Sequence, residues 1–405
     1  MENISIFFSI LNNFLHPDKE CDDLSKITQE EWISMFRLAK EQAVFPIVFD
    51  KAWNQEGYAG MADDMKNAYR LKSRNDVIAQ SLKTEYFLSI YKQFTDEGIH
   101  PLVVKGIILR NIYQKPDYRM SSDEDMLVNK NDFSKVDNIL LSNGYNRQQI
   151  ENPLDEHEIS YYNPSRGSAI ELHLTLFPET SDAYGHLNHE FENVFERAIY
   201  EEINGTKVYT LFHTQHMFYL VCHSLKHFMH SGFGVRQLMD IINFAEVYGN
   251  TIDWDDIIRR AKHENMYVFL MNLFAGGEKY LGFSWEKANL KKPQIKLNPK
   301  NLIIDMIDGG VFGQNDEARL HSSNITLQAV NANKAKAVSK SALFPNFNYM
   351  KNRYPYLKKY KWMLPFAWIQ RIFSYGKRMR KTGIEKTIEV GNKRVDLLKQ
   401  YDIIE

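Results

Sequence analysis

Apolar positions recur along the chain with two different periods, and the changes of period divide it into regions. Over residues 28–95 they recur every three or four positions, as at Trp32, Met35 and Phe36, which is the spacing of one helix face. Short alternating runs follow, and helical spacing then returns. The pattern predicts a helical N-terminal region, a small α/β domain, a second helical domain and a C-terminal segment, over residues 1–97, 98–208, 209–300 and 301–405.

The α/β region contains the clearest strand signals. HPLVVKG is a short apolar run that ends in Gly, as expected of a buried strand leading into a turn, and DEDMLV alternates like a second strand. A helix should follow, with its N-cap at Asn131 and its end at Gly144. EISYYN and AIELHLTLF then flank the turn-rich PSRGS, which predicts a β-hairpin. The predicted fold class is α+β, a mixed-strand domain flanked by helical regions.

The near-neutral charge of the chain conceals two oppositely charged parts. The 405 residues include 50 Lys and Arg and 51 Asp and Glu, a net charge of −1. No Asp or Glu occurs between Ala318 and Ile384, a stretch with 14 basic residues, so the other residues hold 36 basic and 51 acidic side chains. We therefore expect an acidic body and a basic C-terminal segment, and a neutral total does not exclude an anionic partner.

The basic segment also carries many aromatic side chains. After a polar stretch at 322–341, which is expected to be a loop or linker, residues 351–381 interleave Trp362, Phe366 and Trp368 with Lys and Arg. This composition suits a helix at an anionic membrane surface, and it also suits a groove that binds nucleic acid. A third interpretation is a helix that docks on the acidic body, with its aromatic side chains in an ordinary core.

Cysteine content and apolar content limit the class of protein. Only Cys21 and Cys222 occur, too few for a disulfide framework or a four-cysteine zinc site, and 44% apolar residues exclude intrinsic disorder. No stretch approaches the ~20 consecutive apolar residues that span a bilayer, and the N-terminus lacks the features of a secretory signal. We expect a cytoplasmic protein that is at most peripheral to a membrane.

Candidate chemistry begins with carboxylates on two predicted strands. Side chains two apart on a strand share a face, so Asp123 and Asp125 project together while Glu124 faces away. Two carboxylates this close repel each other unless a cation lies between them, and Mg²⁺ or Mn²⁺ is the usual one. Glu171 and His173 share a face of the predicted hairpin, and Glu171 would complete a three-carboxylate metal site if the two strands are neighbours.

Positive charge and a glycine turn lie upstream of these aspartates. Lys105 and Gly106 fall between a strand and a short helix, where glycine lets the backbone approach a ligand and a helix N-terminus favours anions. Arg110 and Arg119 add positive charge nearby. A phosphate site beside a carboxylate metal site is the equipment for phosphoryl or nucleotidyl transfer.

The motifs of the α/β region resemble those of a known family. The chain resembles the uncharacterised nucleotidyltransferase family of the polymerase-β-like superfamily in a series of motifs: Lys105-Gly106, Leu109, Tyr113 with Pro116, Arg119, Asp123 with Asp125, and Glu171-Leu172-His173. The resemblance extends more weakly to His223, His227, Asp240 and the C-terminal segment.

The resemblance implies a minimal polymerase-β-like nucleotidyltransferase domain with Mg²⁺ or Mn²⁺ held by Asp123, Asp125 and Glu171, and with Gly106 in the phosphate-binding turn. It implies an enzyme that transfers NMP from an NTP, with ATP as the expected donor, to a hydroxyl or phosphate of an acceptor. The residues expected to bind the nucleotide are Lys105, Gly106, Arg110, Arg119, His173, His223 and His227.

Two departures from the superfamily pattern favour an alternative. The turn is Lys-Gly-Ile, without the hydroxyl of a Gly-Ser turn, and the residue between the two aspartates is the charged Glu124 instead of an apolar one. Glu124 should therefore reach solvent or a cation. The alternative is a degenerate, non-catalytic adaptor with the nucleotidyltransferase fold, associated with a membrane.

Four histidines fall on one face of the predicted helix after residue 209. They are His216, His223, His227 and His230. They could form a polar helix face packed on the α/β domain, line the nucleotide pocket, or bind zinc. The zinc interpretation lacks support because the metalloprotease pattern requires a Glu between a His-x₃-His pair, and residues 224–226 are Ser-Leu-Lys.

Overall fold

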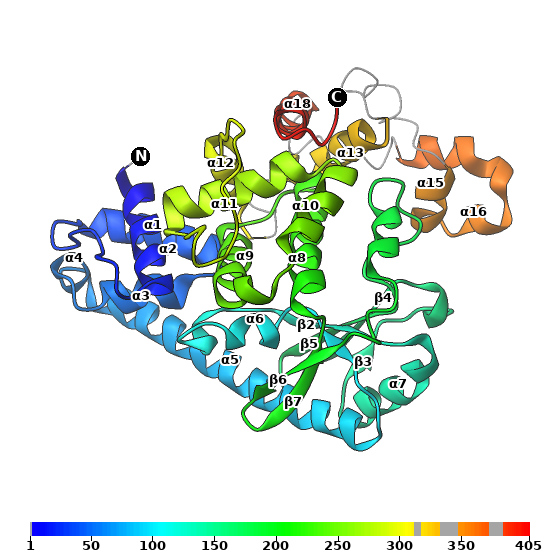
Figure 1. Cartoon of the computed structure of the whole chain (residues 1–405), viewed down its shortest axis with the longest axis horizontal. Coiled ribbons are helices and arrows are strands. Elements are labelled where there is room, and N and C mark those ends of the chain that lie inside the picture. The colour runs from blue at the N-terminus through cyan, green and yellow to red at the C-terminus, as the bar shows by residue number, and fades with distance from the viewer. Residues whose placement is uncertain (1, 312–316, 333–346, 372–383) are drawn as a thin grey trace.

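A five-stranded mixed sheet forms the centre of the α/β region in the computed structural model, which describes residues 2–311, 317–332, 347–371 and 384–405 (Figure 1). The strand order is β1-β2-β5-β4-β3, with β2 and β5 parallel and the other neighbours antiparallel. A separate β6–β7 hairpin leads into the second helical region. The strands are β1 Leu102–Val103, β2 Asp123–Leu127, β3 Asn146–Arg147, β4 Glu158–Asn163, β5 Ser168–His173, β6 Ile199–Ile203 and β7 Thr206–Thr210.

The register of the sheet brings the predicted carboxylates together. Asp125 of β2 lies opposite Glu171 of β5. The two strands are therefore neighbours, which is the condition for the predicted three-carboxylate site. β4 and β5 form the predicted hairpin, with Glu158 opposite His173. β5 ends at His173, which makes it shorter than the apolar run AIELHLTLF.

The two faces of the sheet differ as the alternation predicts. One face packs Met126, Ile170 and Leu172 into a hydrophobic core with α5 (Asp63–Asp96) and α7 (Phe133–Ser142). The opposite face presents the carboxylates to α8 (His213–Met229). Burial of the apolar face therefore fixes which side chains face the other way.

The N-cap of helix α7 lies one residue later than predicted. Its N-cap is Asp132, while the side chain of Asn129 accepts a hydrogen bond from the Asn131 N–H in the preceding turn, so the predicted cap at Asn131 is wrong. Its end agrees with the prediction, because Gly144 follows the C-cap with φ of +80°, a conformation that glycine adopts without strain.

The helical N-terminal region is confirmed, and it shares a hydrophobic core with the second helical region. A capping box at Thr28 and Glu31 begins α2. Trp32 and Phe36 of α2 belong to the same core as Phe228 and Phe269. The helices before the sheet are α1 Glu2–Leu15, α2 Gln29–Glu41, α3 Phe45–Ala52, α4 Glu56–Ala59 and the long α5.

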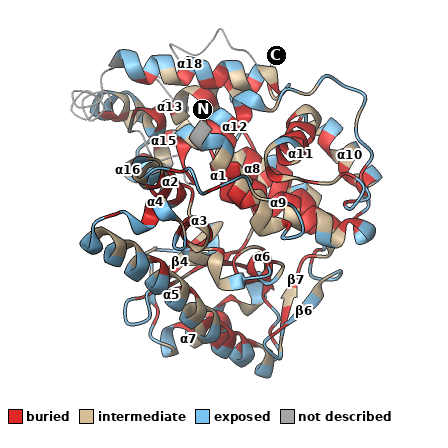
Figure 2. Cartoon of the chain, turned by 90° about the vertical axis from the view of Figure 1, so that its left-hand side faces the viewer, coloured by how far each residue is buried: buried red, intermediate tan, exposed pale blue. Residues whose placement is uncertain are grey.

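Helices α8 and α9 lie at the middle of the second helical region and are largely buried (Figure 2). His216 of α8 contacts the carbonyl of Val104 at 2.7 Å, which ties this helix to the end of β1. The helices that follow α8 are α9 Val235–Tyr248, α10 Trp254–His263, α11 Tyr267–Leu281 and α12 Lys300–Gly309. The short helix α6, Ile107–Asn111, lies in the α/β region between β1 and β2.

The polar stretch at 322–341 is not the loop that its composition predicts, as far as it is described. Residues up to Ala332 belong to α13 (Glu317–Ala332), which packs against α18 (Ile384–Gln400), and the rest lies outside the described residues. Arg319, the first cation of the basic segment, pairs with the buried Asp305 at 2.6 Å. Tertiary partners therefore stabilise a helix that polar composition alone disfavours.

Residues 347–371 form a small helical unit at one side of the molecule (Figure 1). It contains α15 (Phe347–Arg353) and α16 (Tyr356–Lys359), followed by a helical turn and a helix at 364–371. Met350, Tyr354, Leu357 and Ala367 form its own core. Of the segment 351–381, residues 372–381 lie outside the described residues.

Aromatic and aliphatic side chains of this unit remain exposed. Trp362 is 71% exposed, Phe366 60% and Ile369 52%. The docked-helix interpretation, which places the aromatic side chains in an ordinary core, therefore does not hold for these side chains. None of the helices in the described parts of the chain has the length and apolar character needed to cross a membrane.

The α+β fold class is confirmed, with a mixed sheet and helical flanks. The divisions near residues 97, 208 and 300 stay predictions, since one hydrophobic core combines the first and the third of these regions.

Candidate active site

A cavity of about 270 Å³ lies between the polar face of the sheet and helices α8 and α9. The sheet contributes Asp123, Asp125, Glu158, Glu171 and His173, and the turn before α6 contributes Lys105 and Gly106. The helices contribute most of the opposite wall. The polar residues on that wall are His223, Ser224, Lys226, His227, Arg236, Gln237 and Asp240.

Three side chains in the cavity could hold a metal ion together. Asp125, Glu171 and His173 each place a ligand atom within 4.8 Å of the others. Asp123 lines the same cavity, is partly exposed, and makes no side-chain hydrogen bond or ion pair within the described parts of the chain. The structure thus brings all three predicted carboxylates to one cavity, and His173 lies with them.

Asp125 is buried and contacts two basic groups. Its Oδ1 lies 2.6 Å from Nζ of Lys105 and 3.3 Å from Nε2 of His173. Burial opposes ionisation, but Lys105 and His173 outweigh it and hold the pKa of Asp125 below its usual range. Burial likewise disfavours charge on Lys105, yet the Asp125 carboxylate raises its pKa. Both groups are therefore charged at neutral pH.

The pKa of Glu171 is raised, whereas that of Asp125 is lowered. Burial, followed by the carboxylates of Asp125 and Glu158, raises the pKa of Glu171 to about 8. Without a metal ion this carboxyl group therefore retains its proton near neutral pH, and a divalent cation would have to displace that proton to bind.

This proton gives a testable dependence of stability on pH. Between the ordinary pKa of about 4.3 and about 8, the folded chain holds the Glu171 proton and the unfolded chain does not. The free energy of unfolding of the metal-free protein should therefore fall as pH rises across this window, by at most roughly 1.4 kcal/mol per pH unit.

Urea unfolding of the wild type and of Glu171→Gln, at several values between about pH 5 and about pH 8, measures this difference. We expect the wild type to lose stability relative to the variant as pH rises, and Mg²⁺ or Mn²⁺ to reduce the loss. Parallel curves for the two proteins would contradict the raised pKa.

The glycine turn is confirmed, although a side chain fills the space beside it. Gly106 has φ of +56°, and a Cβ there would lie 1.8 Å from Oε2 of Glu124. The same oxygen accepts a hydrogen bond of 2.6 Å from the Ile107 N–H. The first N–H of the short helix α6 is thus already satisfied by Glu124, so the expected phosphate contact at this N–H is not available in this arrangement.

Arg110 is the predicted residue that the structure does not bring to the cavity. Its guanidinium is buried, pairs with Glu124 and donates to the hydroxyl of Ser121. Glu124 therefore reaches a cation, as expected, and that cation is Arg110. Because this pair lies away from the polar face, we remove Arg110 from the candidate nucleotide-binding residues.

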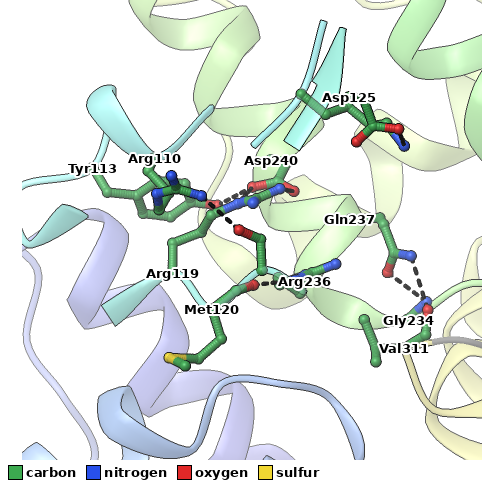
Figure 3. A network of polar contacts seen from close by, with 12 residues as sticks. Arg110, Tyr113, Arg119, Met120, Asp125, Gly234, Arg236, Gln237, Asp240 and Val311 are labelled. Carbon is green, nitrogen blue, oxygen red and sulfur yellow. Dashed lines mark hydrogen bonds and ion pairs between the residues drawn. The ribbon is translucent and has the colours of Figure 1, made fainter. Parts of the chain in front are cut away.

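Arg119 lines the cavity, but its charge is already paired. Its Nε and Nη2 donate to the two carboxylate oxygens of Asp240 at 3.0 and 2.7 Å, and the hydroxyl of Tyr113 donates to the same carboxylate (Figure 3). All three groups are buried. This network joins the segment before β2 to helix α9, and Arg119 is in a position to orient the aspartate strand.

The four histidines of the α8 face have different surroundings. His223 lies 3.0 Å from Nζ of Lys105, and His227 lies 3.3 Å from His223, so both line the cavity. Burial, followed by Lys105, lowers both pKa values, that of His227 to about 3. His216 and His230 instead contact Val104 and Tyr184. The groups of candidate metal ligands in the described chain include none of these four residues.

Several residues of the cavity were not predicted. Glu158 follows from the hairpin register, which places it opposite His173, and Lys226 lies between two predicted histidines. Arg236 of α9 has no sequence signal, because only the tertiary fold brings α9 to the sheet.

The donor set fits a hard divalent cation. Asp123, Asp125 and Glu171 supply carboxylate oxygens, which Mg²⁺ and Mn²⁺ prefer, and the imidazole of His173 is a ligand that Mn²⁺ accepts better than Mg²⁺.

A family model matches the part of the chain that contains the cavity. The family model described as "Uncharacterised nucleotidyltransferase" matches residues 28–281, more than half of the chain, and this range includes every residue of the cavity. No curated protein and no solved structure shows a significant match. The chain therefore belongs to the uncharacterised nucleotidyltransferase family.

Proposed function

We propose that the protein is a metal-dependent nucleotidyltransferase that moves NMP from an NTP, with ATP as the expected donor, to a hydroxyl or phosphate group of an acceptor. Membership of the family supports nucleotidyl transfer in general. The observation that carries the specific proposal is the convergence of Asp123, Asp125 and Glu171 in one cavity beside Lys105.

Each group in the cavity has a role in this proposal. Asp123, Asp125 and Glu171 would hold Mg²⁺ or Mn²⁺, which supplies neutralisation of phosphate charge when bound. Glu171, whose pKa is raised to about 8, would lose its proton on binding the metal, and its carboxylate would then help to activate the acceptor hydroxyl. Lys105 supplies positive charge beside the aspartates, and neutral His223 and His227 are hydrogen-bonding groups for the nucleotide.

The test is NTP turnover in the presence and absence of Mg²⁺ or Mn²⁺, with release of pyrophosphate as the readout. We expect turnover only with metal, and only when an acceptor with a free hydroxyl or phosphate is present.

One observation supports the alternative, a non-catalytic adaptor. Nζ of Lys105 lies 2.6 Å from Oδ1 of Asp125. The ammonium group therefore neutralises this carboxylate and competes with a metal ion for the same oxygen. An adaptor of this kind would bind NTP equally well with and without Mg²⁺, or not at all. Calorimetry with NTP in both conditions separates the two functions.

We also propose that the exposed face of residues 358–369 contacts an anionic lipid surface. Trp362, Phe366 and Ile369 are more than half exposed, and the exposed Lys358, Lys359 and Lys361 lie close to Trp362 in the sequence. The acid-free stretch from Ala318 to Ile384 leaves no Asp or Glu nearby in the sequence to repel phosphate. Aromatic side chains at headgroup level with flanking lysines favour binding to anionic membranes.

Vesicle flotation tests this surface with the full chain. We expect binding to vesicles of phosphatidylserine and phosphatidylcholine, and weaker binding to phosphatidylcholine alone. Changing Lys358, Lys359 and Lys361 to Gln should weaken binding by about a hundredfold, since each basic side chain near the surface contributes about 1 kcal/mol.

The double variant Trp362→Ala, Phe366→Ala should also weaken binding, while Trp53→Ala, at an exposed tryptophan of the N-terminal region, should not. RNA binding that depends on the same lysines, without any vesicle binding, would contradict the membrane proposal and favour nucleic acid.

A further inference from the structure

Arg236 differs from Lys105 and Arg119 of the same cavity because its charge has no ion-pair partner among the described residues. Lys105 pairs with Asp125, and Arg119 pairs with Asp240. Arg236 has no carboxylate within ion-pair distance in the described residues, and it lies close to Arg119 and Asp240 in Figure 3. Its side chain is only 9% exposed. A buried guanidinium without a carboxylate is costly, so its presence points to an anion that binds there.

The hydrogen bonds of Arg236 leave one edge of the guanidinium without a partner among the described residues. Nη1 donates to the carbonyl oxygen of Met120, which holds the group against the segment before β2 (Figure 3). Nε has no hydrogen-bond partner, and no partner is found for Nη2 within the described parts of the chain. Nε and Nη2 form the side edge of the guanidinium, whose two parallel N–H groups match two oxygens of a phosphate.

The charge of Arg236 persists despite burial. Burial, followed by the neighbouring Arg119, lowers the pKa of Arg236 to about 10, so the guanidinium remains protonated at neutral pH. Asp240 and Asp123 act on it in the opposite direction. The hydrogen bond from Arg236 to Met120, in the segment just before β2, places its guanidinium toward the Asp123 side of the cavity.

Lys226 marks the other side of the same cavity. It also lacks an ion pair among the described residues, but the carboxylates that act on it are Glu158, Glu171 and Asp125. The two unpaired cations are thus near different carboxylates, and they give the cavity two distinguishable ends.

We propose that the unpartnered edge of Arg236 binds the polyphosphate of the donor nucleotide, so that the polyphosphate extends from Asp123 toward α9 and the acceptor enters at the Lys226 end. This inference rests on the proposed nucleotidyl transfer. The carbonyl of Met120 orients the guanidinium of Arg236. Its Nε and Nη2 then donate hydrogen bonds to two phosphate oxygens, which leave the enzyme as part of pyrophosphate.

Calorimetric titration of the full chain with pyrophosphate and Mg²⁺ tests the assignment. Arg236→Gln should weaken pyrophosphate binding by about tenfold to a hundredfold, because it removes a charge-assisted bidentate contact. Arg236→Lys should lie between this variant and the wild type, because lysine restores the charge without the planar fork.

Lys226→Gln is the matched control, since it removes one unpaired positive charge from the same cavity. We expect Lys226→Gln to lower the affinity for pyrophosphate by less than about threefold, because Lys226 lies at the end of the cavity away from Arg236. Thermal unfolding of all variants shows whether loss of the contact with Met120 destabilises the fold. Arg236→Lys keeps a hydrogen-bond donor for the Met120 carbonyl. A lower pyrophosphate affinity in this variant therefore reports the loss of the two parallel N–H groups of the guanidinium.

Equal losses in Arg236→Gln and Lys226→Gln, unchanged binding in Arg236→Gln, or no pyrophosphate binding by the wild type would each overturn the assignment. NTP turnover by the wild type reports on the proposed function separately. If the wild type turns over NTP and Arg236→Gln binds pyrophosphate as tightly as the wild type, only the assignment of Arg236 is wrong. Absence of turnover with the expected loss of affinity defeats only the nucleotidyl transfer.

Discussion

Asp123→Asn should lower metal-dependent NTP turnover by about a thousandfold or more, because it removes a carboxylate that the proposed metal site requires. Asp123 makes no side-chain hydrogen bond or ion pair within the described chain, so this change should leave the unfolding temperature unchanged. Loss of pyrophosphate release without loss of stability would show that Asp123 acts in the chemistry and not in folding.

Adding Asp125→Asn should keep turnover at background but also lower stability. Asp125 is the ion-pair partner of Lys105, and its loss would leave a largely buried ammonium group without its carboxylate. The control is Asp155→Asn with Glu156→Gln, two exposed acids near β4 whose removal should change neither quantity. Wild-type turnover in Asp123→Asn would remove the basis of the metal-site proposal.

Asp240→Ala should produce the largest loss of stability, about 3–5 kcal/mol. The carboxylate accepts two hydrogen bonds from Arg119 and one from Tyr113, and all three side chains are buried. Removing it leaves a buried guanidinium unpaired, which costs far more than the hydrogen bonds themselves. Thermal unfolding should show a decrease of roughly 5 °C in the unfolding temperature.

The double variant Arg119→Met, Asp240→Leu distinguishes the cause. If the loss comes from the stranded charge, replacing both partners by apolar side chains should recover most of the stability, to within about 2 kcal/mol of the wild type. Tyr113→Phe, which removes one hydrogen bond, should cost only about 1 kcal/mol. A double variant as unstable as Asp240→Ala would indicate that shape, and not charge, determines the stability of this network.

Local patterns predicted the part of the site that depends on local geometry. Alternation along DEDMLV placed Asp123 and Asp125 on one face and Glu124 on the other, and the turn-rich PSRGS predicted the hairpin that presents Glu171 and His173. Both rest on the two-residue period of a strand, which needs no knowledge of distant partners. The motifs of the family resemblance pointed to the same residues.

Partners far apart in the sequence could not be predicted. The pairing of Arg110 with Glu124, which takes Arg110 out of the cavity, depends on how α6 packs over β2. Arg236 and Asp240 reach the cavity only because α9 packs beside α8. The helix α13 was missed for the same reason, since its polar composition gives little helical signal and its packing against α18 and the ion pair of Arg319 with Asp305 hold it in place.

The most direct measurement is the position of Mn²⁺ in a crystal of the full chain grown with a non-hydrolysable NTP analogue, located by its anomalous scattering. We expect manganese bound by Asp123, Asp125 and Glu171, with the polyphosphate in the same cavity. A second cluster of candidate ligands, His189, Glu190, His263 and Glu264, lies elsewhere in the described structure. Manganese at that cluster alone, with the nucleotide absent from the cavity, would contradict the account.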